Sequence, residues 1–342
     1  LLIDRTNKIF TTTGHAFLKL PSGNSTEGLF AASTNAAPGR RSTNNFIEIT
    51  SEQYIVLTNS AVFHDGVRVT QLEGNEIKGG MDCRRLDVTF AGTNQIETLL
   101  AQTNVVIEQK QNGETNRFLA ERGFYTATNG ILKLTGNPKW QAGKRQGKGD
   151  VLYVDAQKQT LDAVSNAWMR LPASELAANI PGDSSPSKAS GAAAPQLEFA
   201  DIYCHDYTVS AQNAVFREKV RVRHPKMDWD SDEITVTSSP GPEPKRIGMV
   251  ANRNVVFQLV QPSGQQVHGK CDTAFYDYAA GPMGTNDVLR LTGNAILETT
   301  NGTLKNNIII LDHGENKLIA PGNYVIYGTA SAFGTNSLAP KL

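Results

Sequence analysis

Apolar and polar residues alternate along most of this chain, in stretches that are separated by turn residues. Leu132 and Leu134 flank Lys133, for example, and the same alternation recurs in stretch after stretch. Because successive strand side chains point to opposite faces of a sheet, each stretch predicts a strand with one apolar and one polar face. Asn-Gly pairs such as Asn129-Gly130 mark tight turns, and helical periodicity is scarce. The pattern predicts an all-β chain of many short antiparallel strands.

The alternating pattern occurs twice along the chain. Residues 132–155 are matched by residues 289–312, with an offset of 157 at both ends, and residues 60–69 are matched by residues 213–222. Each repeat contains smaller units of two strands and a turn, none of which could bury its apolar face alone. The units therefore have to pack edge to edge in a continuous sheet system. Unit starts are predicted near Gly14, Ser60, Thr103, Gly136, Ser165, Asn213, Asn252, Gly293 and Gly322.

Changes in composition divide the chain into six segments. Two segments rich in Ser, Ala, Gly and Pro stand at equivalent points of the repeats, and we interpret both as low-complexity inserts. The predicted order is the end of a preceding repeat (1–20), an insert (21–45), the first repeat segment (46–172), an insert (173–196), the second repeat segment (197–330) and a tail (331–342). Residue 1 falls inside a strand of the repeat. We therefore expect the natural chain to begin earlier and to carry its export signal there.

Charge and cysteine content exclude some classes of protein. With 33 basic and 33 acidic side chains the net charge is zero, so nucleic acid is not an expected partner. No apolar run approaches the roughly 20 residues of a membrane-spanning helix. Cys83, Cys204 and Cys271 lack the C-x-x-C spacing of zinc and redox sites. We expect buried or free thiols, and a disulfide between two of them is the alternative.

No group of residues points to catalysis, to a metal site or to a cofactor. Cys204-His205-Asp206 are consecutive, and alternation of strand faces would keep them from acting together. The six histidines lack the paired spacing of metal ligands. Asp155 and Asp312 end matched strands, where an Asp that caps its own turn explains them. The sequence predicts a protein that is not an enzyme.

The recurring unit resembles the OstA-like family of lipopolysaccharide-transport proteins. The unit is Thr-Gly-Asn, an alternating stretch, a polar turn and an apolar strand that ends in Asp, as in residues 132–155 and 289–312. The resemblance covers nearly the whole chain apart from the two inserts, which are longer than the tight turns expected in this family. It implies a repeat-built open β-jellyroll, with two sheets in a V. Bridge components and the soluble N-terminal domain of the translocon component share this fold.

The resemblance also implies a binding surface in place of a point-like active site. Acyl chains would lie on inward-facing apolar residues, and phosphate and sugar groups at the open edge near Arg68, Arg221 and Arg290. The inward residues are Phe63, Val67, Val69, Val105, Ile107, Leu132, Leu134, Leu152 and Val154 in the first copy, and Phe216, Val220, Val222, Val255, Phe257, Leu289, Leu291, Ile308 and Ile310 in the second. Alternation is the same for an open groove and for a filled core. A structural or carbohydrate-binding sandwich or solenoid with a closed core is therefore the alternative.

The family implies partners and a compartment as well. The expected partners are lipopolysaccharide or a related lipid, and other β-jellyroll transport proteins that add to edge strands. Head-to-tail association with further copies of the chain follows the same principle. The expected role is a transport bridge for outer-membrane assembly, and the expected compartment is the periplasm.

Overall fold

A computed structural model describes residues 2–4, 9–21, 45–91, 95–111, 114–172, 199–225, 227–239, 246–260, 266–281, 284–300, 302–312, 315 and 317–328. Within these residues the chain forms twenty-one β-strands and no helix. No helix among them is therefore long and apolar enough to cross a lipid bilayer. The chain divides into two compact units, Leu1–Ala167 and Trp168–Leu342.

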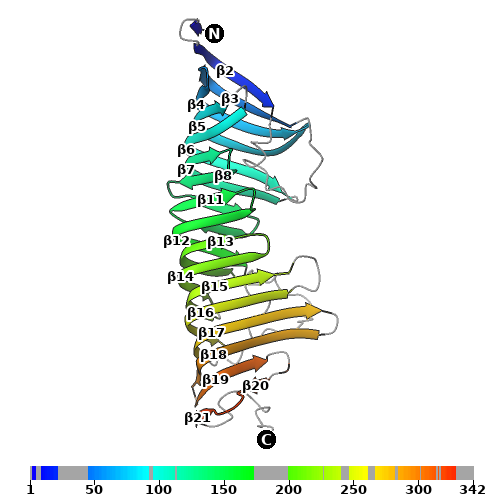
Figure 1. The fold of residues 1–342 in the computed structure, drawn as a ribbon, viewed down its shortest axis with the longest axis vertical. Helices are drawn as coiled ribbons and strands as arrows, with labels where there is room; N and C mark the ends of the chain where they lie inside the picture. Colours follow the sequence, from blue (N-terminus) through cyan, green and yellow to red (C-terminus); the bar gives the residue numbers. More distant parts are fainter. Residues whose placement is uncertain are drawn as a thin grey trace, which may run out of the picture. The chain divides into compact units, whose positions relative to one another are not determined.

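The first unit is an antiparallel meander (Figure 1). Its strands are β1 (Leu2–Asp4), β2 (Ile9–Pro21), β3 (Asn45–Val56), β4 (Ser60–Glu73), β5 (Glu76–Ala91), β6 (Gln95–Gln111), β7 (Glu114–Thr126), β8 (Ile131–Thr135), β9 (Lys139–Ala142), β10 (Arg145–Lys148), β11 (Val151–Asp155) and β12 (Thr160–Pro172), the last of which runs into the second unit. Strands β2 to β7 each pair with the next, β7 pairs with both β8 and β9, and β8 pairs with β11.

The second unit repeats this plan. Its strands are β13 (Phe199–Val209), β14 (Asn213–His224), β15 (Met227–Ser238), β16 (Arg246–Val260), β17 (Gln266–Gly281), β18 (Gly284–Thr299), β19 (Gly302–Asp312), β20 (Lys317–Ile319) and β21 (Val325–Gly328). Strands β13 to β19 each pair with the next, and β19 pairs with both β20 and β21.

The long strands are bent near the middle. At the bend of alternate strands two successive residues have positive φ, and β14, for example, skips Glu218 and Lys219 in its register with β15. Gly, Asn and Asp tolerate positive φ better than other residues, which is why they recur here. The pairs are Gly14-His15, Asp65-Gly66, Thr103-Asn104, Gly136-Asn137, Ser165-Asn166, Glu218-Lys219, Arg253-Asn254 and Gly293-Asn294. Several predicted unit starts, Gly14 and Gly293 among them, therefore lie at bends within long strands.

Each bend divides its strand into two arms. Arm A includes residues 213–217 of β14 and 273–281 of β17, and arm B includes residues 220–224 of β14 and 266–270 of β17. Within each unit, arm A pairs with arm A and arm B with arm B, so two sheet faces meet at the bends. The predicted all-β, repeat-built open jellyroll is confirmed. The strands reach 17 residues, longer than predicted, because the bends have the composition of turns.

Two predicted turns are confirmed in detail. Asp155 Oδ1 accepts hydrogen bonds from the backbone N–H groups of Gln157 and Lys158, and Asp312 Oδ1 accepts one from that of Glu315. Residues 22–44 of the first predicted insert, the second insert (173–196) and the tail (331–342) lie outside the described residues. The boundaries of the six segments stay predictions.

Candidate functional site

Apolar side chains line the inner face of both arms in each unit. In the first unit, the row Phe63, Leu86, Ala101, Gly123, Leu134, Leu152 and Ala163 runs along arm A in register. In the second unit, the corresponding row is Tyr207, Phe216, Ile234, Ala251, Ala274, Leu291 and Ile309. These residues are buried. Alternation along each strand, combined with the printed register, thus produces a continuous apolar surface in each unit.

Most residues predicted to face inward do so. Fifteen of the eighteen are 3% exposed or less, and Val154, opposite Leu132, is half-buried. The fifteen are Phe63, Val67, Val69, Val105, Ile107, Leu132, Leu134, Leu152, Phe216, Val220, Val222, Val255, Phe257, Leu289 and Leu291. Their role in lipid contact stays a prediction.

The inward placement predicted for Ile308 and Ile310 is wrong. Ile309 pairs with Leu291 and is fully buried, whereas Ile308 and Ile310 pair with Thr292 and Arg290 on the outer face. Residues 308–311 are apolar at every position, so alternation cannot tell which of them face inward. The register of β19 with β18, which shifts between Thr292 and Ala295, shows that Ile309 is the residue that faces inward.

Aromatic side chains of the inner face are packed against their neighbours and buried. Tyr54 and Phe63 lie with ring centroids 5.8 Å apart, and their repeat counterparts Tyr207 and Phe216 lie 5.9 Å apart. Phe63 and Phe216 have 1% or less of their surface exposed. The two units therefore repeat the same aromatic pair on neighbouring strands of arm A. An occupant of the interior would have to displace side chains.

The inner face also holds polar residues, at positions where the alternating pattern predicts apolar ones. Gln71 and Gln109 both pair with Gly79, and Asp287 pairs with Tyr278. All three polar residues are buried. The sequence alone does not show that these polar residues face inward, because this depends on the strand register.

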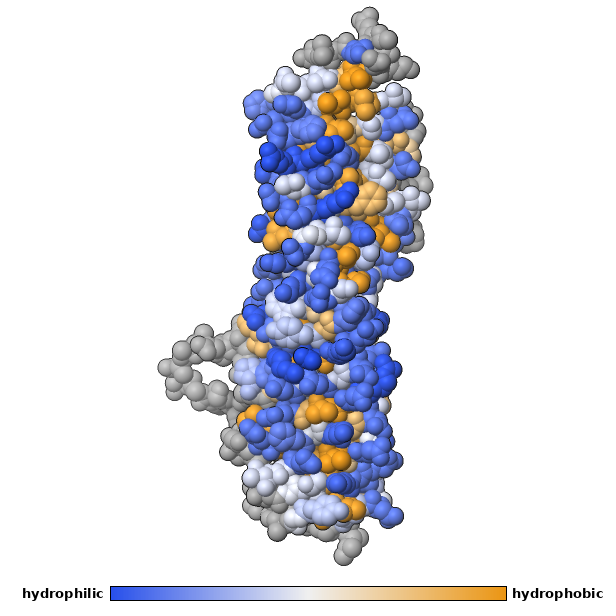
Figure 2. All heavy atoms as spheres, turned by 90° about the vertical axis from the view of Figure 1, so that its left-hand side faces the viewer, coloured by the Kyte–Doolittle hydropathy of each residue, from blue (hydrophilic) through white to orange (hydrophobic). Residues whose placement is uncertain are grey.

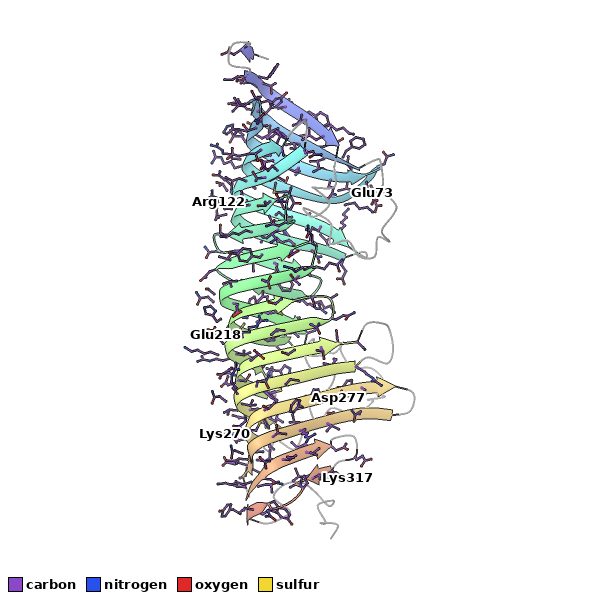
Figure 3. All side chains as sticks on the ribbon, viewed as in Figure 1. Glu73, Arg122, Glu218, Lys270, Asp277 and Lys317 are labelled. Atoms are coloured by element: carbon purple, nitrogen blue, oxygen red, sulfur yellow. The ribbon has the colours of Figure 1, made fainter. Side chains whose placement is uncertain are left out.

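Polar contacts hold the outer side of the bends together. Asp232 Oδ2 accepts a hydrogen bond from Asn254 at 3.0 Å, and Asp272 Oδ2 accepts one from Asn294 at 3.2 Å. In both cases an outward-facing Asp at the bend of one strand contacts the Asn of the positive-φ pair on a neighbouring strand. Figure 2 looks onto this side of the molecule and shows mainly hydrophilic side chains with apolar ones between them. Figure 3 shows Glu218 at the bends, and Glu73, Asp277 and Lys317 toward the far strand ends.

The three cysteines occupy matching inner positions of these bends. Cys83 and Cys271 pair with Val67 and Val255, and Cys204 lies in the bulge of β13 against β14. The Cys83 thiol donates to the carbonyl oxygen of Arg85, as the Ser51 and Ser231 hydroxyls at matching positions donate to residues two further along. All three thiols are free, as expected. Burial raises the pKa of Cys83 and Cys204 to about 12 and that of Cys271 to about 11, so they are poor nucleophiles.

The prediction that basic residues gather at the open edge is wrong for Arg68 and Arg221. Both follow a bend by two residues and lie on the outer face of arm B. Arg68 Nε contacts Asp82 Oδ1 at 2.8 Å. Because the bends were not visible in the sequence, neither was the position of these residues along their strands.

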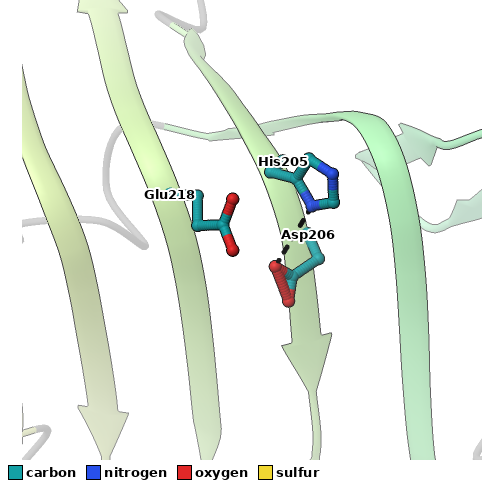
Figure 4. A group of neighbouring side chains, drawn as sticks. All are labelled: His205, Asp206 and Glu218. Carbon is teal, nitrogen blue, oxygen red and sulfur yellow. Dashed lines mark ion pairs between the residues drawn. The ribbon is translucent and has the colours of Figure 1, made fainter.

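A bulge brings three metal-ligating groups together on the outer face (Figure 4). One ligand atom each of His205, Asp206 and Glu218 lies within 4.8 Å of the others. Simple alternation would separate His205 from Asp206, but β13 shifts register between Tyr203 and Asp206. Arg217 Nη1 lies 3.6 Å from Asp206 Oδ2 and already balances its charge. We therefore interpret the cluster as a surface charge network.

Sequence comparison places the chain beside one family. The family described as LptA/(LptD N-terminal domain) LPS transport protein matches residues 47–160 and 205–317, one stretch in each unit. The crystal structure of LptH, described as the LptA homologous periplasmic component of the conserved lipopolysaccharide transport device from Pseudomonas aeruginosa, is 15% identical. It covers 34% of this chain and 81% of its own, with a TM-score of 0.31. No curated protein sequence matches the chain significantly.

Proposed function

The chain belongs to the family of LptA/(LptD N-terminal domain) lipopolysaccharide transport proteins, and on that premise we propose that it is a periplasmic bridge component. Lipopolysaccharide would travel with its acyl chains between arm A and arm B of each unit. The protein would act without chemistry, as a series of similar binding sites.

The observation that supports this proposal is the apolar inner row that repeats from strand to strand in both units. Phe63 and Leu134 in the first unit correspond to Phe216 and Leu291 in the second. Transfer of acyl chains from water to such a surface is worth about 0.8 kcal/mol per methylene group. Because neighbouring strands present similar surfaces, an acyl chain would meet sites of similar affinity along each unit.

Loading requires the interior to open, because the inner side chains are packed. The bends suit this movement. Their positive-φ pairs, such as Glu218-Lys219, leave the regular ladder, and their outer contacts are single polar pairs such as Asp272 with Asn294. A change of angle at the bends would separate the arms without breaking the pairing within either arm.

Edge strands would join the protein to its neighbours. The last described strand, β21, pairs with β19 on one side, and all four of its residues are exposed, among them Val325, Ile326 and Tyr327. No described strand pairs with its other edge. An exposed apolar edge is a template for strand addition, by another jellyroll transport protein or by a second copy of the chain.

Site-specific photocrosslinking in cells tests the proposal. The probe is placed at Phe216 or Leu291, which are buried, and in matched controls at Arg217 or Arg290, their outward neighbours. We expect lipopolysaccharide adducts at the two inward positions only. If the folded and exported protein gives no adduct at any position, the transport proposal fails. The closed structural sandwich would then replace it.

A further inference from the structure

Arm B of the second unit places an indole N–H on its apolar inner face. Trp229 of β15 lies between Val222 of β14 and Phe257 of β16 in the strand register, and it is only 2% exposed. Its indole nitrogen is buried and makes no hydrogen bond to any residue that the structure describes. An indole nitrogen can only donate, and a buried one usually finds an acceptor. The second unit therefore holds an open donor within an apolar interior.

The aromatic stack beside Trp229 does not satisfy this N–H. The ring planes of Trp229 and Phe257 are inclined by only 22°. Because the N–H bond lies in the plane of the indole, it points along the Phe257 ring and not at its face. A hydrogen bond to the π-electrons of this ring would need the two planes to be close to perpendicular. The stack therefore holds the indole in place and leaves its donor available.

The first unit builds the same position without a strong hydrogen-bond donor. Met81 of β5 lies between Val69 and Ile107, which are the repeat counterparts of the two neighbours of Trp229. Met81 is buried as well, with 3% of its surface exposed. An apolar side chain thus fills this place in the fold, whereas burying an indole N–H without an acceptor is unfavourable. Packing explains a large apolar side chain here, but it does not explain the donor.

The place of Trp229 along its strand indicates what the donor would meet. From the strand end toward the bend, the inward residues of arm B in β15 are Met227, Trp229 and Ser231. At about 3.4 Å per residue, Trp229 lies about 7 Å inside the strand end. An amphiphile whose head group stayed at the strand end would bring the carbonyl group of its acyl chain to this depth. Its hydrocarbon would continue over apolar residues nearer the bend, such as Val220 and Val255.

We propose that the Trp229 indole donates a hydrogen bond to an acyl carbonyl oxygen, of an ester or an amide, in the carried amphiphile. This rests on the proposed function. The acyl chain enters when the arms separate, and its carbonyl oxygen then supplies the acceptor that the N–H lacks among the described residues. A hydrogen bond made in apolar surroundings is stronger than one made in water. The second unit thus distinguishes how the hydrocarbon is linked to its head group, whereas the first unit, with Met81, does not.

Two glycerol amphiphiles that differ only in this linkage test the inference on the purified full chain. Monomyristoylglycerol has an ester carbonyl, and the tetradecyl ether of glycerol has a methylene group in its place. Trp229→Phe keeps an aromatic ring against Phe257 and removes the N–H. We expect the ratio of ester affinity to ether affinity to be about fivefold lower in Trp229→Phe than in the wild type. Because each ratio is taken within one variant, a general change in packing cancels from it.

The indole N–H gives a second, local readout. In a proton–nitrogen correlation spectrum, the ester should move the Trp229 indole proton signal downfield, and the ether should not. This signal is the one that disappears in Trp229→Phe. The matched control is Trp168→Phe, because the Trp168 indole faces outward and already donates to Asp201 at 3.0 Å. Trp168→Phe should leave the ester-to-ether ratio unchanged.

The outcomes separate the two proposals. A ratio that is the same in the wild type and in Trp229→Phe overturns the role of Trp229 and leaves the bridge function intact, and so does an equal fall in Trp168→Phe. If the wild type binds neither amphiphile, the role of Trp229 is overturned, and the proposed function fails with it if cells give no adducts. Should Trp229→Phe not fold, the wild-type spectrum decides. A downfield shift with the ester alone supports the inference, and no shift of any of the three indole signals overturns it.

Discussion

The ring of Phe257 lies over Gly269 of the neighbouring strand, so that a Cβ atom at Gly269 would fall inside the ring. The two residues are directly paired between β16 and β17. On its other side, Phe257 stacks on Trp229, with centroids 5.0 Å apart and planes inclined by 22°. The glycine thus leaves the space that two aromatic rings need in one inner row of arm B.

Gly269→Ala should therefore destabilise the second unit. The added methyl group forces the Phe257 ring from its place, and overpacking of this kind costs about 1–3 kcal/mol. Thermal unfolding with near-ultraviolet circular dichroism would measure the loss of stability and of the Trp229 stacking. Phe257→Leu in the same chain should recover part of the loss, because a smaller side chain makes room. A variant as stable as the wild type would contradict the packing described here.

Substitution of two glycines at bends of the first unit should distinguish the cost of backbone strain from the cost of side-chain crowding. Gly66 and Gly136 both have positive φ, but a Cβ at Gly66 meets nothing within 4 Å, whereas one at Gly136 would lie 2.5 Å from Glu121 Cβ. Gly66→Ala should cost about 1 kcal/mol for the left-handed backbone alone. Gly136→Ala should cost about 1–3 kcal/mol more. Equal losses in chemical denaturation would show that the β7 strand yields at Glu121.

Ion pairs of the two units should differ in strength. Asp201 accepts hydrogen bonds from Arg170 at 2.9 and 2.8 Å and from the Trp168 indole, and its side chain is only 21% exposed. Arg68 and Asp82 share one contact and are 69% and 51% exposed. Double-mutant cycles with alanine should give a coupling of about 1 kcal/mol for Arg170 with Asp201, and about 0.3 kcal/mol for Arg68 with Asp82. A larger coupling energy for Arg68 with Asp82 than for Arg170 with Asp201 would mean that solvent exposure does not determine the strength of these ion pairs.

Alternation and duplication were enough to predict the fold class and most inward residues. Leu132-Lys133-Leu134 and Leu289-Arg290-Leu291 could be assigned because polar residues separate the apolar ones. The same reasoning fails at Ile308-Ile309-Ile310, where every residue is apolar, and at His205-Asp206, where a bulge puts neighbours on one side. Alternation can be read from the local sequence, but a bulge changes which of the following residues face inward, and a bulge depends on pairing with another strand.

The bends were the main feature that sequence could not reveal. Gly136-Asn137 and Gly293-Asn294 have the composition of hairpin turns, and both turns and bends require positive φ. At a hairpin turn the chain reverses direction, whereas at a bend it continues along the same neighbouring strands. Which of the two occurs depends on pairing partners that are far away in the sequence. For the same reason, Asp287 could not be placed on the inner face without the register of β17 and β18.

Stability should fall at alkaline pH because of the three buried thiols. In the folded protein burial raises the pKa of Cys83 and Cys204 from 9.0 to about 12, and that of Cys271 to about 11, so the folded state favours the neutral thiol. This contribution is fully present below the unfolded value of 9.0 and is lost as pH rises from there toward 12. Serine occupies the matching positions Ser51 and Ser231, so a variant with Cys83, Cys204 and Cys271 changed to serine should fold. Thermal melts between about pH 8 and 11 should show a smaller decline in the serine variant than in the wild type. Identical declines would assign the alkaline loss to other groups, such as Tyr125, whose pKa burial raises to about 12.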